Sequence, residues 1–203
     1  VFAMHNAVYP LSQELQELPR PDHNGEKVVT FLGRITMQKG PEYFVEAAAR
    51  VLAKTDGVRF VMAGSGDMMN KMIDLVAQRG IADKFHFPGF MRGRQVQEVL
   101  ADSDVYIMPS VSEPFGISPL EAMQVGCPSI ISHQSGCAEI LSHVIKTDYW
   151  DIDAMADAIY AIVKYPAMYK SLRELGRDEV NNIKWYDVGL KVRRIYDMVI
   201  SGC

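Results

Sequence analysis

The sequence predicts a single α/β domain, with a parallel sheet of about six strands, helices on both faces of the sheet and further helices at the C-terminus. Three observations predict this fold. Short apolar runs alternate along the chain with longer segments in which apolar residues recur at helical spacing. The runs are apolar at consecutive positions, which is typical of parallel strands that are buried on both faces. Glycine follows several of the runs and marks the turn from strand to helix.

Residues 1–27 differ from the rest of the chain, because turn-forming residues cluster around Pro21 and Gly25. We interpret them as an inter-domain linker or entry segment, followed by one domain over residues 28–203. Valine, isoleucine and phenylalanine are frequent in the expected strands. These strands lie at residues 28–32, 60–63, 85–87, 105–108 and 129–131.

Helices are expected between and after these strands. The spacing of one helix face is clearest in Phe44, Ala47, Ala48 and Val51. A proline is favoured in the first turn of a helix, so Pro166 marks the start of another. The expected helices lie at residues 44–52, 69–77, 96–100, 119–125, 138–141, 152–163, from 166 onward, and 185–199.

Composition and charge exclude several classes of protein. The chain has 203 residues, of which 48% are hydrophobic and 23% charged, as in an average globular protein. Lysine and arginine number 21 against 25 aspartates and glutamates, so the formal charge is −4, which disfavours a sequence-independent DNA-binding protein. The cysteines are Cys127, Cys137 and Cys203, whose odd number and wide spacing predict neither a disulfide framework nor a zinc cluster. We therefore expect a reducing, cytoplasmic compartment.

The apolar runs and the first residues of the chain carry two further expectations. No run approaches the length of a transmembrane helix, so we expect no membrane-spanning segment. The sequence begins at Val1 without an initiator methionine or a signal-peptide pattern. We interpret the chain as a part of a longer protein.

The loops that follow the strands hold the candidate site residues, because parallel sheets bind ligands beyond the carboxyl ends of their strands. The loop after the first strand runs from Gly33 to Gly40 and contains two cations, Arg34 and Lys39. Arginine binds phosphate oxygens bidentately and lysine acts as a point charge, so this loop is either a phosphate site or an ordinary solvated loop. Gly64 follows the second strand and forms a tight turn or lets the backbone approach a ligand.

Two carboxylates follow the strand at residues 105–108. Glu113 lies in the loop, where the expected partners of its carboxylate are ligand hydroxyl groups. Glu121 lies in the first turn of the next helix, and Ser118 three residues earlier predicts a capping box that would explain Glu121 without a ligand. Free backbone amides are expected to offer an anion site at Phe115, Gly116, Ile117 and Ser118. Cations, amides and carboxylates together predict a site for a phosphate-bearing, hydroxyl-rich ligand such as a sugar nucleotide.

The same residues form motifs in a fixed order along the chain. Gly33-Arg34 and Lys39-Gly40 match a G-R-x-x-x-x-K-G loop. Glu113 and Glu121 match an E-x7-E motif in an E-P-F-G setting. Two further elements are Asn6-Ala7-Val8, which is similar to an inter-domain N-G-V element, and Trp185 before the last helix. By these motifs, nearly the whole chain resembles the C-terminal, donor-binding domain of family 4 glycosyltransferases of the GT-B fold, a group that includes glycogen synthases.

The resemblance implies a Rossmann-like domain that binds a UDP-, ADP- or GDP-linked sugar, in an enzyme that transfers the sugar with retention and needs no metal or other cofactor. The implied catalytic residues are Arg34, Lys39 and Glu113. Arg34 and Lys39 would bind the diphosphate and stabilise charge on the leaving nucleotide, and Glu113 would hold the hydroxyl groups of the sugar. Glu121 would accept hydrogen bonds from the ribose diol. Further donor contacts are implied at Gly33, Gly64, Phe115, Gly116, Ile117 and Ser118, with Phe90 and Met91 facing the base.

The resemblance also implies partners. The first is an N-terminal acceptor domain of the same polypeptide, without which this chain is expected to bind donor weakly and to transfer little or no sugar. A glucan is the acceptor that the resemblance favours, and neither nucleic acid nor an integral membrane segment is implied. Two alternatives stay open: a nucleotide or sugar-phosphate binding module without transfer activity, and another GT-B enzyme such as a sugar-nucleotide epimerase. The sequence does not determine the nucleotide, the sugar, the acceptor or the oligomeric state.

Overall fold

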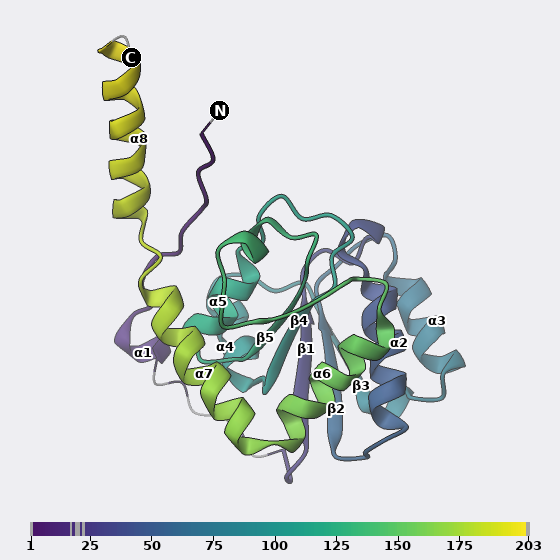
Figure 1. The fold of residues 1–203 in the computed structure, drawn as a ribbon. Helices are drawn as coiled ribbons and strands as arrows, with labels where there is room; N and C mark the ends of the chain where they lie inside the picture. The colour runs from purple at the N-terminus through teal and green to yellow at the C-terminus, as the bar shows by residue number, and fades with distance from the viewer. Residues whose placement is uncertain (1, 17, 19–20, 22, 202–203) are drawn as a thin grey trace.

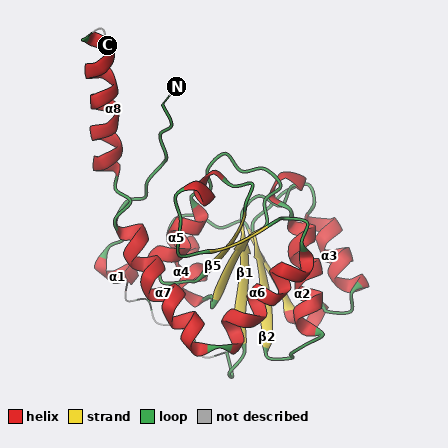
Figure 2. Ribbon diagram, in the orientation of Figure 1, coloured by secondary structure: helices red, strands yellow, loops and turns green. Residues whose placement is uncertain are grey.

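A six-stranded parallel sheet runs through the middle of the molecule in the computed structural model (Figure 2). The structure describes residues 2–16, 18, 21 and 23–201. The strands are β1 (Lys27–Leu32), β2 (Val58–Ala63), β3 (Phe85–Gly89), β4 (Val105–Met108), β5 (Ser129–Ser132) and β6 (Ile145–Thr147). Their order in the sheet is β3-β2-β1-β4-β5-β6, and every neighbouring pair is parallel. The predicted α/β fold with a parallel sheet is confirmed.

Helices cover both faces of this sheet (Figure 1). The α-helices are α1 (Gln13–Gln16), α2 (Pro41–Leu52), α3 (Met69–Gln78), α4 (Arg94–Asp102), α5 (Ser118–Gln124), α6 (Ile152–Lys164), α7 (Pro166–Asn181) and α8 (Trp185–Ile200). Short 3₁₀ helices lie at Met37–Lys39 (η1), Ala82–Lys84 (η2) and Gly136–Glu139 (η3). One core cluster joins α2, α3 and α6 to the sheet, and a second joins α4, α5 and α7 to the opposite face.

Alternation along β4 explains why this strand is apolar at every position. Val105 and Ile107 belong to the core under α2 and α6, whereas Tyr106 and Met108 belong to the core under α4 and α5. All four side chains are buried. Successive side chains of a strand point to opposite faces, so a sheet covered on both sides requires such runs.

Strand β6, like the short helix α1, is not predicted from the sequence. It has three residues, and Lys146 stands between Ile145 and Thr147. Pairing with β5, through Ile130 opposite Ile145, places it at the sheet edge. The helix expected near residues 138–141 is the 3₁₀ turn η3. Both segments are too short to show a period of their own.

The strand order reverses between β1 and β4, which pair with each other through Val29–Val105 and Phe31–Ile107. The connection after β1 leads to α2 on one face, and the connection after β4 leads to α5 on the other. Open α/β sheets bind ligands beyond the carboxyl ends of the strands at such a reversal, and we call this region the crevice. The loops at residues 33–40 and 109–117 border this crevice.

The entry segment packs on the surface of the domain. Val8 forms an isolated parallel bridge with Lys184, and Gln124 Nε2 donates a hydrogen bond to the Tyr9 carbonyl at 2.8 Å. Helix α8 projects away from the sheet, and the first residues of the chain extend beside it (Figure 1). The linker role of residues 1–27 stays a prediction.

Asp151 caps helix α6 with its side chain. Its Oδ1 atom accepts a hydrogen bond from the Ala154 backbone N–H at 2.9 Å, while Asp153 pairs with Arg50 of α2. We expect Asp151→Ala to lower the free energy of unfolding by about 1 kcal/mol, because a backbone donor loses its partner. Urea denaturation measures this change. Asp151→Asn keeps a capping oxygen and should retain most of the stability, and equal losses in the two variants would refute the capping role.

Candidate functional site

The two loops at the crevice are joined to each other by backbone contacts. The Val111 N–H donates a hydrogen bond to the Gln38 carbonyl at 2.9 Å. Gly40 has φ +64°, and a Cβ at this position would lie 2.1 Å from the Pro109 carbonyl oxygen. Any larger residue at Gly40 would therefore push the loops apart. Glycine at this position lets the two loops form one side of the crevice.

Lys39 and Glu113 form an ion pair across this junction, although 74 residues separate them in the chain. Their side chains are only 19% and 11% exposed. The Phe115 N–H also donates to Glu113 Oε1 at 3.4 Å. The structure thus brings together two predicted catalytic residues. An anion that reaches Lys39 would compete with Glu113 for its charge.

The Arg34 side chain contacts its own loop instead of Glu113. Its guanidinium is exposed and donates a hydrogen bond to Gln38 Oε1 at 3.1 Å. The structure therefore shows Lys39, and not Arg34, in contact with Glu113. Arg34 is available to a ligand at the crevice, because its present partner is an uncharged side chain of its own loop.

Glu121 is not part of a capping box, and this prediction is wrong. Helix α5 has Ile117 at its N-cap without any side-chain cap bond, so Ser118 lies inside the first turn. The hydroxyl of Ser118 instead interacts with that of the fully buried Tyr106, whose pKa burial raises far above its usual value. The capping explanation for a glutamate at position 121 therefore does not hold.

The Glu121 carboxylate lines a cavity of 370 Å³ between α5 and the entry segment, together with Ile117, Tyr9 and Trp185. It makes no hydrogen bond or ion pair with any residue that the structure describes. Burial raises the pKa of this carboxyl above its ordinary value. A partly buried acceptor without a partner is typical of a binding residue rather than of a structural one.

The predicted backbone contacts have structural roles in the free protein. The Gly33 N–H donates to the Ala63 carbonyl at 3.0 Å, and the Gly64 N–H donates to the Gly89 carbonyl at 2.8 Å. A Cβ on Gly64 would lie 1.8 Å from the Gly33 carbonyl oxygen. Close packing of two loops thus explains the glycine at 64. A donor contact at Gly33 or Gly64 stays a prediction.

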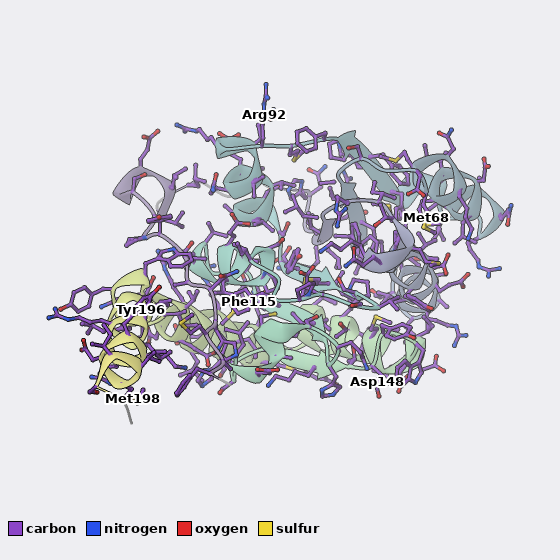
Figure 3. The ribbon with its side chains drawn as sticks, turned by 90° about the horizontal axis from the view of Figure 1, so that it is seen from above. Met68, Arg92, Phe115, Asp148, Tyr196 and Met198 are labelled. Carbon is purple, nitrogen blue, oxygen red and sulfur yellow. The ribbon has the colours of Figure 1, made fainter. Side chains whose placement is uncertain are left out.

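The residues predicted to face the base lie at the rim. Phe90 is 68% exposed, and Met91 lines a separate cavity with Leu18 and Arg94. Seen from above, Arg92 of the same loop points outward from the molecule, whereas Phe115 lies near its middle (Figure 3). No described contact joins Phe90 to the Lys39–Glu113 pair, so base recognition by this loop stays a prediction.

Sequence reasoning missed two buried hydroxyl groups at the crevice. Thr36 Oγ1 and Ser110 Oγ lie in the loops that follow β1 and β4, and neither atom has a hydrogen-bond partner within the described part of the chain. Buried polar atoms are normally paired, so an ordered water or a ligand is the expected partner. The clue in the sequence was their position directly after two adjacent strands.

Burial limits the chemistry of the cysteine side chains. Cys137 is buried near Glu113, and burial with this negative charge raises the pKa of its thiol to about 12, so the thiol stays protonated and a poor nucleophile at neutral pH. Cys127 is also buried, and Cys203 lies outside the described residues.

No group of three or more metal-ligating side chains is found in residues 2–16, 18, 21 and 23–201. Among the same residues no helix has the length and apolarity needed to cross a bilayer.

The chain is similar in sequence to known glycosyltransferases. The family model described as glycosyl transferases group 1 matches residues 14–179. An uncharacterised glycosyltransferase of Methanocaldococcus jannaschii is 43% identical over 107 residues, covering 53% of this chain and 27% of its own length. The 2-deoxystreptamine N-acetyl-D-glucosaminyltransferase of Niallia circulans is 32% identical over 159 residues, which cover 77% of this chain and 41% of that protein. The chain therefore spans less than half the length of these curated relatives.

The fold also matches solved structures. Among them is S. aureus TarM in a complex that contains UDP, with a TM-score of 0.80 and 19% identity, covering 96% of this chain and 39% of TarM. At this identity the likeness shows the fold alone. The family match covers most of the sequence, including both crevice loops, and the chain belongs to the glycosyl transferases group 1 family.

Proposed function

We propose that this chain is the donor-binding half of a retaining hexosyltransferase, and that the crevice between β1 and β4 takes the nucleoside diphosphate of a sugar donor. The observation that carries the proposal is the contact of Lys39 with Glu113, which brings a phosphate-binding cation and a hydroxyl-binding carboxylate to one point. The position of this point at the reversal of strand order supports it. So does the UDP in the similar TarM structure.

Lys39 and Arg34 are proposed to assist departure of the nucleotide. The bond between the anomeric carbon and the phosphate oxygen breaks, and its electron pair stays on the diphosphate. A new bond forms on the same face of the anomeric carbon to an acceptor oxygen, whose proton passes to the departing phosphate oxygen. Negative charge grows on the leaving phosphate, and positioned cations stabilise that charge more than the ground state. Glu113 would then exchange Lys39 for the hydroxyl groups of the sugar.

The remaining predicted residues would hold the donor in place. Glu121 is the proposed acceptor of hydrogen bonds from the ribose diol, because its carboxylate is free and partly shielded from water. Ile117 lines the same cavity. The backbone of Phe115 and Gly116 lies beside Glu113, where it could contact sugar or phosphate.

The acceptor is proposed to be bound largely by a further domain of the same polypeptide. Helix α8 has no buried residue, and its large exposed side chains include Tyr186, Tyr196 and Ile200. An apolar helix surface of this kind is typical of an interface. The shares of the relatives that this chain covers also support a second domain. We accordingly expect this chain alone to bind nucleotide and to transfer little or no sugar.

Titration of the chain with UDP, ADP and GDP by calorimetry tests the proposal. One diphosphate should bind, and Glu121→Gln should weaken its binding about tenfold, because an ionised acceptor is worth more than a neutral amide. Glu174→Gln, on the exposed side of α7, is the matched control and should leave affinity unchanged. Absence of binding at millimolar nucleotide would contradict a donor site in this chain.

Glu121→Gln is also expected to stabilise the fold at neutral pH, although it weakens nucleotide binding. Burial raises the pKa of Glu121 above its ordinary value of 4.5, so ionisation costs free energy in the folded state only. That cost is absent below pH 4.5 and fully present above the raised pKa. Glu121→Gln should therefore raise the free energy of unfolding at pH 7 and have less effect at pH 4, as measured by urea denaturation. Equal effects of the substitution at both pH values would contradict a raised pKa of Glu121.

A further inference from the structure

Another cavity, of 580 Å³, lies on the β5–β6 side of Glu113, and Glu113 is its one lining residue among the predicted donor contacts. Cavities of this size are typical of small-ligand sites. The backbone and side chains that line it come from the β4–α5 loop, the β5–η3 segment and β6. They are Glu113, Pro114, His133, Gln134, Ser135, Gly136, Ala138, Glu139 and Lys146.

Hydrogen bonds connect the two loops that line this cavity. The Gly136 N–H donates to the Glu113 carbonyl at 2.9 Å, and a Cβ on Gly136 would lie 2.1 Å from the Pro114 carbonyl oxygen. Beneath this contact Ser132 Oγ donates to the Ser110 carbonyl at 2.6 Å and lies 2.9 Å from Ser135 Oγ. All three serines are buried. The cavity is therefore bounded by a backbone that two adjacent loops fix together.

The cavity contains a cation without a described partner. Of its two carboxylates, Glu113 forms an ion pair with Lys39, and Glu139 is hydrogen-bonded to His5 of the entry segment at 2.9 Å. Lys146 and His133 have no ion pair or side-chain hydrogen bond with any residue that the structure describes. Lys146 lies on β6 and is half-buried. A shielded cation without a partner favours an anionic ligand.

The position of the cavity relates it to the donor. Glu113 stands between Lys39 on one side and this cavity on the other, since its side chain pairs with the first and lines the second. A donor with its diphosphate at Lys39 and a ligand in the cavity would therefore meet beside Glu113.

We infer that this cavity binds an anionic, hydroxyl-bearing group of the acceptor, namely a sugar or polyol that carries a phosphate or carboxylate. Lys146 holds the anion, with His133 as a second donor, and the carboxylate of Glu139 accepts hydrogen bonds from hydroxyl groups. The assignment to the acceptor rests on the proposed function. A neutral glucan would leave Lys146 without a partner, so we expect a charged acceptor in place of the glucan.

Titration with small probes tests the inference. Glucose 6-phosphate, glucuronate and glucose are added to the chain by NMR, with and without saturating UDP. At least one of the two anions should bind ten times more tightly than glucose, and which one binds distinguishes phosphate from carboxylate. Lys146→Gln should weaken that binding at least tenfold and leave UDP affinity unchanged. Lys164→Gln, at the exposed end of α6, is the matched control and should have no effect.

The outcomes separate this inference from the proposed function. Binding of the anion that persists under saturating UDP and depends on Lys146 supports a separate acceptor-side cavity. Displacement of the anion by UDP, equal binding by inorganic phosphate alone, or no loss in Lys146→Gln would each overturn it. Failure of the proposed function would show instead as absence of UDP binding, which these variants do not affect.

Discussion

Lys39→Ala is expected to weaken nucleoside diphosphate binding by about 10- to 150-fold, because a charged hydrogen bond contributes about 1.5–3 kcal/mol. The substitution removes the cation that the β1–α2 loop presents at the crevice and leaves Glu113, only 11% exposed, without its partner. An uncompensated carboxylate at this depth also destabilises the fold. Calorimetry with UDP and urea denaturation measure the two effects separately.

A second variant distinguishes loss of binding from loss of structure. In Lys39→Ala with Glu113→Gln the stranded charge is gone, so stability should return toward that of the unchanged chain while nucleotide affinity stays low. If affinity also returned, Lys39 would act only by neutralising Glu113. Lys71→Ala, which removes an exposed lysine paired with Glu42 on α2, is the control for a change of net charge.

Gly64→Ala is expected to destabilise the chain by about 3 kcal/mol or more, which is the range of substitutions that force a backbone shift. The added Cβ would lie 1.8 Å from the Gly33 carbonyl oxygen, and φ is +144°, where side chains are strained. The β1–α2 loop must then move away from β2. Both the midpoint of urea denaturation and the affinity for nucleotide should fall, because Arg34 and Lys39 are carried by this loop.

Gly189→Ala is the matched control for this variant. Gly189 lies within α8, and nothing lies within 4 Å of a Cβ built there. Alanine is favoured over glycine in a helix by about 1 kcal/mol, so this variant should be as stable as the unchanged chain or more so. Similar stability in Gly64→Ala and Gly189→Ala would contradict the close approach of the two loops.

Local patterns were sufficient for five of the six strands and for most helices. β4 was expected at the residues where it occurs, since an apolar run between helical segments has few alternatives. β6 was missed, because three residues around Lys146 become a strand only through their pairing with β5. The capping box at Ser118 was wrong because helix α5 begins at Ser118 itself, with Ile117 at the N-cap. A local motif does not include partners that arrive from elsewhere in the chain.

The sequence by itself determined the α/β class, the loops that border the crevice and the family motifs, because these depend on residues close together in the chain. Only the tertiary structure decided which of the motif residues meet. Lys39 contacts Glu113 because β1 and β4 are neighbours in the sheet, and Lys146 lines a cavity with Glu139 because β6 pairs beside β5. Strand order arises from the packing of the whole sheet, so it sets contacts between residues that no local pattern relates.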